Sequence, residues 1–184
     1  MAVNLGVSRV MLDESAIRDK VRELGAKITN AYKDLDAPLQ TVVILKGAVV
    51  FAADLLRAID LPVRLDFMAI SSYGKQTSSS GVVRILKDLD APIEGAHVLI
   101  VEDIVDSGLT LKYLIDNLAA RGPASVKTCV LLDKPERRQV DIKVDFVGFE
   151  IEDEFVVGYG LDFAEKYRNL PYVGVLDPSQ AHTD

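Results

Sequence analysis

The residues best suited to chemistry stand together in the run VLIVEDIVDSGLT, which occupies residues 98–110. Its first four residues are aliphatic and predict a buried strand, and the carboxylates of Glu102 and Asp103 follow them directly. Carboxylates bind a cation or a diol, whereas the free backbone N–H groups of a helix start bind a phosphate. Those N–H groups belong to Ser107, Gly108, Leu109 and Thr110. One short segment therefore suits a sugar phosphate that carries magnesium.

Two further polar groups come directly after apolar runs. Lys46 and Gly47 end the run TVVILKG, and Asp133 and Lys134 end the run SVKTCVLLDK. Ligands of parallel sheets bind beyond the carboxyl ends of the strands. We therefore expect these groups to meet at one edge of a sheet.

Hydrophobic spacing predicts the elements that must position these residues. Helices are expected over 13–32 with Asp13 as its cap, over 49–59, and from Gly108 to a stop at Gly122 and Pro123. Strands are expected over 41–47, 63–73, 82–88, 97–103, 125–134, 145–151 and 172–177, with a hairpin around the Ser-rich segment 71–81. This alternation predicts an α/β fold, with a mainly parallel sheet flanked by helices on both faces.

Composition narrows the class of protein. A length of 184 residues favours a single domain, 1–184, and a net charge of -7 argues against a nucleic-acid binder. No apolar run approaches the roughly 20 residues that span a bilayer, and no signal peptide is expected. The single cysteine, Cys129, indicates a reducing compartment, so a cytoplasmic location is expected. Only His97 and His182 are present, which argues against a His-rich zinc site and a Ser-His-Asp hydrolase.

Several motifs, taken together, resemble one known family. The motifs are residues 98–110, LKG at 45–47, SSYG at 71–74, LLDKP at 131–135 and DFVGFEIEDEFVVGYGLDFAEKYRNL at 145–170. The first resembles the phosphoribosyl-pyrophosphate motif of the type I phosphoribosyltransferases, and the last is similar to their hypoxanthine-guanine branch. The resemblance covers nearly all of residues 8–177.

The resemblance implies a fold and a reaction. The core of the phosphoribosyltransferase fold would comprise about 35–140 and 170–178, with a small hood formed from the N-terminal segment and about 145–170. The expected reaction transfers the 5-phosphoribosyl group from phosphoribosyl pyrophosphate to N9 of hypoxanthine or guanine. The expected cofactor is Mg²⁺, and the family suggests a homodimer or homotetramer.

The resemblance also implies roles for residues of the 98–110 motif. Glu102 and Asp103 would contact the ribose hydroxyls and the magnesium, and Asp106 would act as general acid/base toward N7 of the purine. Residues Asp106 through Thr110 would hold the 5'-phosphate. Many relatives carry Lys where this chain has Leu109, so phosphate binding would depend more on backbone N–H groups.

Other implied roles lie outside that motif. Lys46, Gly47 and Arg168 would bind pyrophosphate, with a cis peptide bond between Leu45 and Lys46. The purine would be bound by Lys134, which donates to its 6-oxo group, by Phe155, which stacks on its face, and by Val156 and Asp162. Asp162 would also bind a second metal ion. Ser72 and Tyr73 would belong to a lid that excludes water from the reaction.

Three alternatives remain open on the sequence alone. The enzyme could use another base, such as xanthine, and backbone carbonyls near Val156 and Asp162 would decide this. A regulatory RNA-binding protein could have kept the same motif, but the chain lacks a basic stripe. A phospho-acceptor signalling domain also places acidic residues at strand ends, but it has no need of the Ser-Gly turn after Asp106. In isolation, most of these residues would have ordinary structural roles, as a solvated charge, a turn or a helix cap.

Overall fold

The structure, a computed structural model, describes residues 6–72 and 83–177 of the chain. The helices are α1 (Glu14–Tyr32), α2 (Val49–Ala58) and α3 (Leu109–Ala119), with a short 3-10 helix η1 (Pro135–Arg137). The strands are β1 (Val7–Leu12), β2 (Leu39–Leu45), β3 (Val63–Ser72), β4 (Val83–Lys87), β5 (His97–Val105), β6 (Ser125–Asp133), β7 (Phe146–Glu150), β8 (Val156–Val157) and β9 (Val173–Leu176). All three predicted helices are confirmed, with ends that differ by one to three residues.

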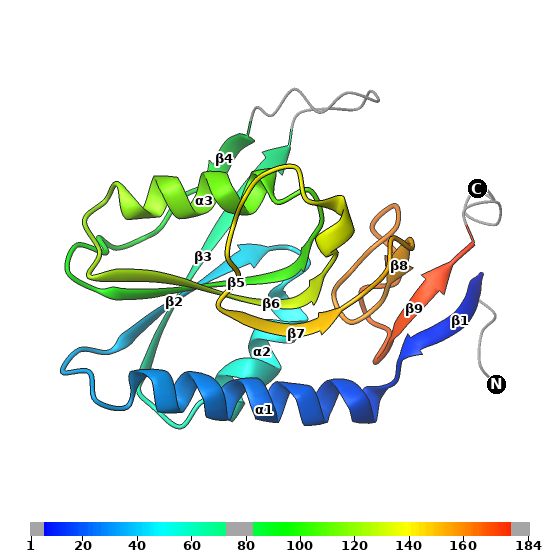
Figure 1. Ribbon diagram of the computed structural model, residues 1–184, viewed down its shortest axis with the longest axis horizontal. Helices are drawn as coiled ribbons and strands as arrows, with labels where there is room; N and C mark the ends of the chain where they lie inside the picture. The colour runs from blue at the N-terminus through cyan, green and yellow to red at the C-terminus, as the bar shows by residue number, and fades with distance from the viewer. Residues whose placement is uncertain (1–5, 73–82, 178–184) are drawn as a thin grey trace.

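The larger sheet has the strand order β4-β3-β2-β5-β6-β7, and its neighbouring strands are parallel except for the antiparallel pair β3 and β4. Helices α1 and α2 cover one face of this sheet and α3 covers the other (Figure 1). Because both faces are covered, residues 39–44 of β2 are all buried. This explains why residues 42–45 of the strand are a continuous apolar run and not an alternating one.

Helix α1 forms where its sequence pattern predicts it. Asp13 caps the helix, and its Oδ1 accepts a hydrogen bond from the backbone N–H of Ala16 at 2.8 Å. The apolar positions repeat every three or four residues and lie buried against the sheet, namely Ile17, Val21, Leu24, Ile28 and Tyr32. No helix within the described ranges is long and apolar enough to cross a membrane.

A smaller sheet of β1, β9 and β8 lies beyond one end of the larger sheet, and we call it the hood sheet (Figure 1). Two boundaries that we expected between core and hood are wrong. Residues 173–176 were expected in the core, but β9 pairs with β1 and β8 in the hood sheet. Residues 146–150 were expected in the hood, but β7 pairs with β6 and extends the larger sheet. Apolar content could not separate the two sheets, since strands of both contain short runs of buried apolar residues.

Strand β5 is longer than the predicted strand 97–103, so the acidic pair Glu102 and Asp103 does not lie at its end. Pairing of β2 with β5 ends at Val101, whereas pairing of β5 with β6 continues to Val105 and Asp133. Glu102 and Asp103 therefore lie within the strand, beside a position that β2 has already left. Because β2 no longer pairs with β5 there, the side chains of Glu102 and Asp103 can reach the space beside the end of β2, although β5 itself continues.

The predicted hairpin is confirmed, because β3 and β4 pair in antiparallel register. Ser72 is the last residue of β3. Tyr73 and most of the Ser-rich segment lie outside the described residues, so the lid expected there stays a prediction.

Gly25 of α1 generates a prediction about stability. A Cβ at this position would lie 2.4 Å from the backbone oxygen of Ala58 in α2, so the two helices approach as closely as glycine allows. Alanine favours a helix by about 1 kcal/mol over glycine, but overpacking costs about 1–3 kcal/mol. Gly25→Ala should therefore lower the free energy of unfolding, measured by urea denaturation. The exposed helix substitution Asn30→Ala serves as the control and should be neutral or stabilising; a stabilised Gly25→Ala would contradict the contact.

Candidate active site

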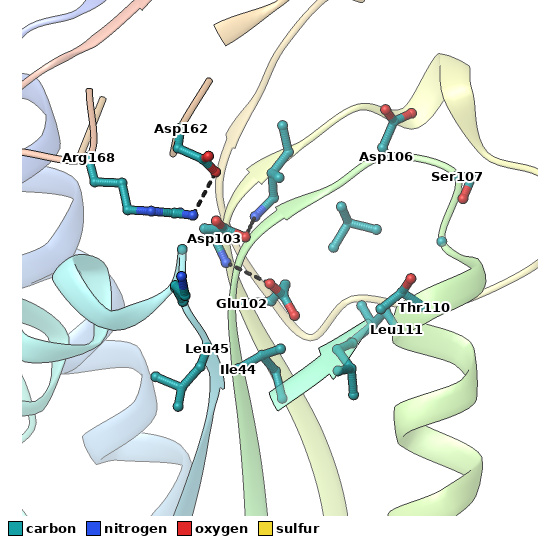
Figure 2. Close-up of a pocket in the computed structure, with 16 residues that line it drawn as sticks. Ile44, Leu45, Glu102, Asp103, Asp106, Ser107, Thr110, Leu111, Asp162 and Arg168 are labelled. Atoms are coloured by element: carbon teal, nitrogen blue, oxygen red, sulfur yellow. Dashed lines mark hydrogen bonds and ion pairs between the residues drawn. The ribbon is translucent and has the colours of Figure 1, made fainter. Parts of the chain in front are cut away.

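A cavity of about 310 Å³ opens where β2 and β5 end, at the edge of the sheet that the sequence predicted (Figure 2). It brings together the expected polar residues Lys46, Gly47, Glu102, Asp103, Asp106, Ser107, Gly108, Thr110, Asp162 and Arg168. Arg168 and Asp162 lie on one side of the cavity, Asp106, Ser107 and Thr110 on the other, and the acidic pair lies between them (Figure 2). Apart from the residues expected in the lid, four expected residues do not line it, namely Leu109, Lys134, Phe155 and Val156.

One side of the cavity is the turn that leads into α3. Gly108 has a φ of +81°, a conformation in which a residue with a side chain would be strained. Its position immediately before α3 lets the chain turn sharply into the helix. The N–H of Lys112 is the first to bond back to Gly108, so the N–H groups of Leu109, Thr110 and Leu111 precede the helix ladder. Leu109 N–H lies 3.4 Å from the Ser107 hydroxyl oxygen, a long contact. The turn thus presents donors suited to an anion.

The acidic pair forms the floor of the cavity. Glu102 is partly exposed as a residue, but its Oε2 is buried. Desolvation together with the neighbouring Asp103 charge raises the pKa of its carboxyl well above the usual range. Its Oε2 has no hydrogen-bond partner among the described residues. Asp103 Oδ1 accepts a hydrogen bond from the N–H of Ile104 at 2.8 Å. A buried carboxylate oxygen without a partner, next to a second carboxylate, fits a site for a hard cation.

The end of β2 forms a third side of the cavity. The Leu45–Lys46 peptide bond is cis, as the resemblance implied. A Cβ on Gly47 would lie 1.6 Å from Asp103 Oδ2, so a side chain at this position would displace the carboxylate. Lys46 Nζ lies 3.0 Å from Glu165 Oε2, and its charge lowers the pKa of that carboxyl.

The loop after β8 supplies the opposite side. Arg168 Nη2 pairs with Asp162 Oδ1 at 2.8 Å, and Nη1 donates to the Gly160 carbonyl at 2.8 Å. Gly160 rests on the end of β2, since its Cβ would lie 2.1 Å from the Gly47 oxygen. The guanidinium is thus oriented by a loop that packs directly on the cavity.

A separate group of residues lies next to the cavity and includes three of the expected purine-binding residues. Lys134 is only 6% exposed, and its Nζ donates to the Glu154 carbonyl at 2.8 Å and pairs with Asp153 at 3.2 Å. Phe155 is 46% exposed, with its ring edge-on to Phe163. Val156 is buried in β8. A half-exposed aromatic ring beside a buried ammonium suits a flat, polar ligand.

Sequence reasoning missed two residues of the site, Arg137 and Arg138. Arg137 Nε donates to Asp106 Oδ1 at 2.9 Å, and Arg138 Nη1 donates to the Asp106 carbonyl at 3.1 Å. Arg138 also pairs with Asp133. The available signal was the position of PERR directly after Lys134, at a strand end on the same edge of the sheet. Two adjacent arginines in a polar loop are more often solvated, so the pattern carried little weight.

The acidic side chains do not enclose a metal ion by themselves. Within residues 6–72 and 83–177, no three His, Cys, Asp or Glu side chains are grouped closely enough to do so. The donor set is nevertheless of the right chemistry, since all three expected ligands carry carboxylate oxygens. Magnesium keeps most of its coordination for water and substrate oxygens, so one or two carboxylates suffice.

Comparison with known proteins agrees with this arrangement. Residues 11–164 match the model of the phosphoribosyl transferase domain. The chain is 55% identical over 173 residues to the hypoxanthine-guanine phosphoribosyltransferase of Bacillus subtilis (strain 168), covering 94% of this chain and 95% of that protein. It is similar to a solved hypoxanthine phosphoribosyltransferase of Staphylococcus aureus, with TM-score 0.91, 46% identity and coverage of 97% and 96% of the two chains.

A third relative is the hypoxanthine phosphoribosyl transferase of Trypanosoma cruzi, solved to study how its C-terminal region affects oligomeric state and activity. That structure matches with TM-score 0.91 and 43% identity, and covers 97% of this chain and 96% of its own.

The raised pKa of Glu102 generates a prediction about stability and pH. Because the folded-state pKa lies above that of the unfolded chain, the folded protein binds the proton more tightly. This contribution to stability is complete below the unfolded pKa, about 4.3, and is lost as pH rises through the folded pKa. Glu102→Gln, which mimics the neutral form, should therefore be more stable than the parent protein at pH 8 and similar to it near pH 4.5.

The measurement is urea unfolding from pH 4.5 to 8.5, without ligand or magnesium. Glu94→Gln, which changes an exposed carboxylate, controls for the loss of one negative charge. If the two variants changed stability in parallel across this range, the assignment of a raised pKa to Glu102 would be wrong.

Proposed function

The chain belongs to the phosphoribosyl transferase family, and from this premise we propose that it makes purine nucleotides. It transfers the 5-phosphoribosyl group from phosphoribosyl pyrophosphate to N9 of hypoxanthine or guanine, and releases pyrophosphate. This is a purine-salvage reaction, and the enzyme is a pentosyltransferase. The observation that carries the proposal is the single cavity in which the α3 N-terminus, the acidic pair and Arg168 converge, beside the buried Lys134.

The two anionic ends of the sugar substrate bind to opposite sides of the cavity. The 5'-phosphate accepts hydrogen bonds from the turn over 106–110, chiefly from backbone N–H groups, because Leu109 has no charge to offer. Pyrophosphate binds to the other side, at Lys46, Gly47 and Arg168. A planar guanidinium can bind it with two parallel hydrogen bonds.

The carboxylates lie where the ribose hydroxyls and the metal would bind. Glu102 and Asp103 would contact the hydroxyls and the magnesium shell, and Asp162 would hold a second ion. Magnesium, when bound, neutralises phosphate charge and stabilises the leaving pyrophosphate. The unpartnered Oε2 of Glu102 supports this assignment, since a buried carboxylate oxygen without a donor is costly unless a ligand compensates it.

Purine recognition falls to Lys134, Phe155 and Val156. The Lys134 ammonium has three N–H donors. It donates to the Glu154 carbonyl and to the Asp153 carboxylate, and the third donor would bind the purine 6-oxo group. Adenine has an amino group at that position. The amino group and the Lys134 ammonium are both donors, so no hydrogen bond would form between them. Phe155 stacks on the ring, and backbone groups of Val156 read its edge.

The remaining features of the proposal rest on family likeness and composition. The segment that includes Ser72 and Tyr73 acts as a lid that keeps water from the reacting carbon. The protein is cytoplasmic, which agrees with a buried, unpaired Cys129. It forms a homodimer or homotetramer, and the Trypanosoma cruzi relative, studied for its oligomeric state, supports assembly.

Transfer to the four common purine bases tests the proposed function. Purified protein with magnesium and phosphoribosyl pyrophosphate should convert hypoxanthine and guanine to nucleotides. Adenine should react about 10⁴-fold less efficiently, the discrimination typical of an unpaired buried donor. Xanthine is the open alternative, and faster use of xanthine would reassign the base. Equal use of adenine, or hydrolysis without transfer, would overturn the proposal.

Asp106 generates a separate prediction about catalysis. As the group that accepts or stabilises the proton at N7, its loss should affect the chemical step more than binding. Asp106→Asn should lower kcat by about 10²–10⁴-fold and change either KM much less. Asp116→Asn removes an exposed carboxylate from α3 and should leave both constants unchanged. An unchanged kcat in Asp106→Asn would defeat the assignment.

A further inference from the structure

Four charged side chains form a continuous line of alternating sign from the cavity to the purine-binding residues. Asp106 Oδ1 accepts from Arg137 Nε at 2.9 Å, and Arg137 Nη1 lies 3.3 Å from Asp153 Oδ2. The other oxygen of Asp153 lies 3.2 Å from Lys134 Nζ. Arg137 therefore bridges the carboxylates of Asp106 and Asp153. Asp153 also pairs with Lys134, the proposed partner of the purine 6-oxo group.

Stability does not account for this bridge. The side chains of Arg137, Asp106 and Asp153 are 50%, 46% and 47% exposed. Ion pairs this exposed contribute little to folding, because water screens the charges and the long side chains lose freedom. The same segment already fixes the backbone around Asp106 by other means.

Three hydrogen bonds provide that backbone support. Lys134 N–H donates to Val105 O, and Gln139 N–H donates to Ser107 O, both at 2.9 Å. Arg138 donates to the Asp106 carbonyl at 3.1 Å. The position of the Asp106 backbone is thus determined, and what remains free is the direction of its carboxylate, which Arg137 contacts through one oxygen.

We propose that Arg137 is a positioning residue of the transfer reaction. It holds Asp106 by Oδ1 so that Oδ2 faces N7, and through Asp153 it sets the distance from this carboxylate to the Lys134 ammonium. N7 and the 6-oxo group lie side by side on the purine, so their two partners must be held a fixed distance apart. The inference rests on the proposed function and adds to it a residue outside the cavity lining.

Arg137→Gln tests the role because it removes both bonds to the carboxylates. With hypoxanthine, kcat should fall about tenfold, whereas KM for phosphoribosyl pyrophosphate should change less than about twofold. In the Asp106→Asn background the same substitution should lower kcat less than about twofold, because a residue that acts through Asp106 has nothing left to position. A full tenfold loss in that background would overturn the proposal.

Two further variants keep the test decisive. Arg137→Lys retains the charge but reaches only one carboxylate at a time, so its kcat should lie between those of the Gln variant and the parent protein. A Lys variant as fast as the parent protein would show that the bridge is unnecessary and would overturn the proposal. Arg121→Gln breaks a comparable arginine pair, with Asp88, away from the cavity, and should leave kcat unchanged.

The outcomes separate this inference from the proposed function. If the parent protein forms no nucleotide from any base, the proposed function fails and the inference fails with it. If the parent protein transfers normally and Arg137→Gln matches it, only the inference fails. Circular dichroism and thermal unfolding of each variant establish that a lower kcat does not come from loss of fold.

Discussion

The site depends on the close approach of three parts of the chain at Gly47, where the lack of a side chain leaves room for the Asp103 carboxylate and for the backbone of Gly160. A methyl group on Gly47 would lie 1.6 Å from the Asp103 carboxylate, and one on Gly160 would lie 2.1 Å from the Gly47 oxygen. A side chain at Gly160 would therefore collide with backbone at the end of β2, and one at Gly47 would displace the Asp103 carboxylate from its place in the cavity. If this point were forced apart, the sides of the cavity that we propose for phosphate, metal and pyrophosphate would separate together.

The site also reconciles an acidic protein with a highly anionic substrate. The formal net charge is -7, so the cations that attract phosphate must be local. Lys46 and Arg168 are held in place by Glu165 and Asp162, in ion pairs that are partly open to water. The Lys46–Glu165 pair, which is well exposed, can exchange its carboxylate for a phosphate oxygen at small cost. The cavity therefore holds Lys46 and Arg168 in position and still leaves them able to bind substrate.

Much of this arrangement could be predicted from the sequence because local patterns carried it. The 3.6-residue spacing of α1, the continuous apolar run of β2 and the Gly108 turn each have one good structural solution. The assignment of β7 and β9 to their sheets could not be read in the same way, since pairing partners depend on distant segments. The contact of Arg137 with Asp106 was missed for a similar reason: it joins a loop after β6 to a turn after β5, and solvated arginines look the same in sequence.

The pairing of β1 with β9 links the order of synthesis to the completion of the protein. Val7 faces Leu176 across the hood sheet, so strands from near opposite ends of the chain must come together before that sheet exists. On a ribosome, the larger sheet could assemble while β9 is still inside the exit tunnel, because all of its strands precede residue 151. A nascent chain would thus form the turn over 106–110 before the hood sheet, and a chain truncated after β7 would lack both the hood sheet and the loop that carries Asp162 and Arg168.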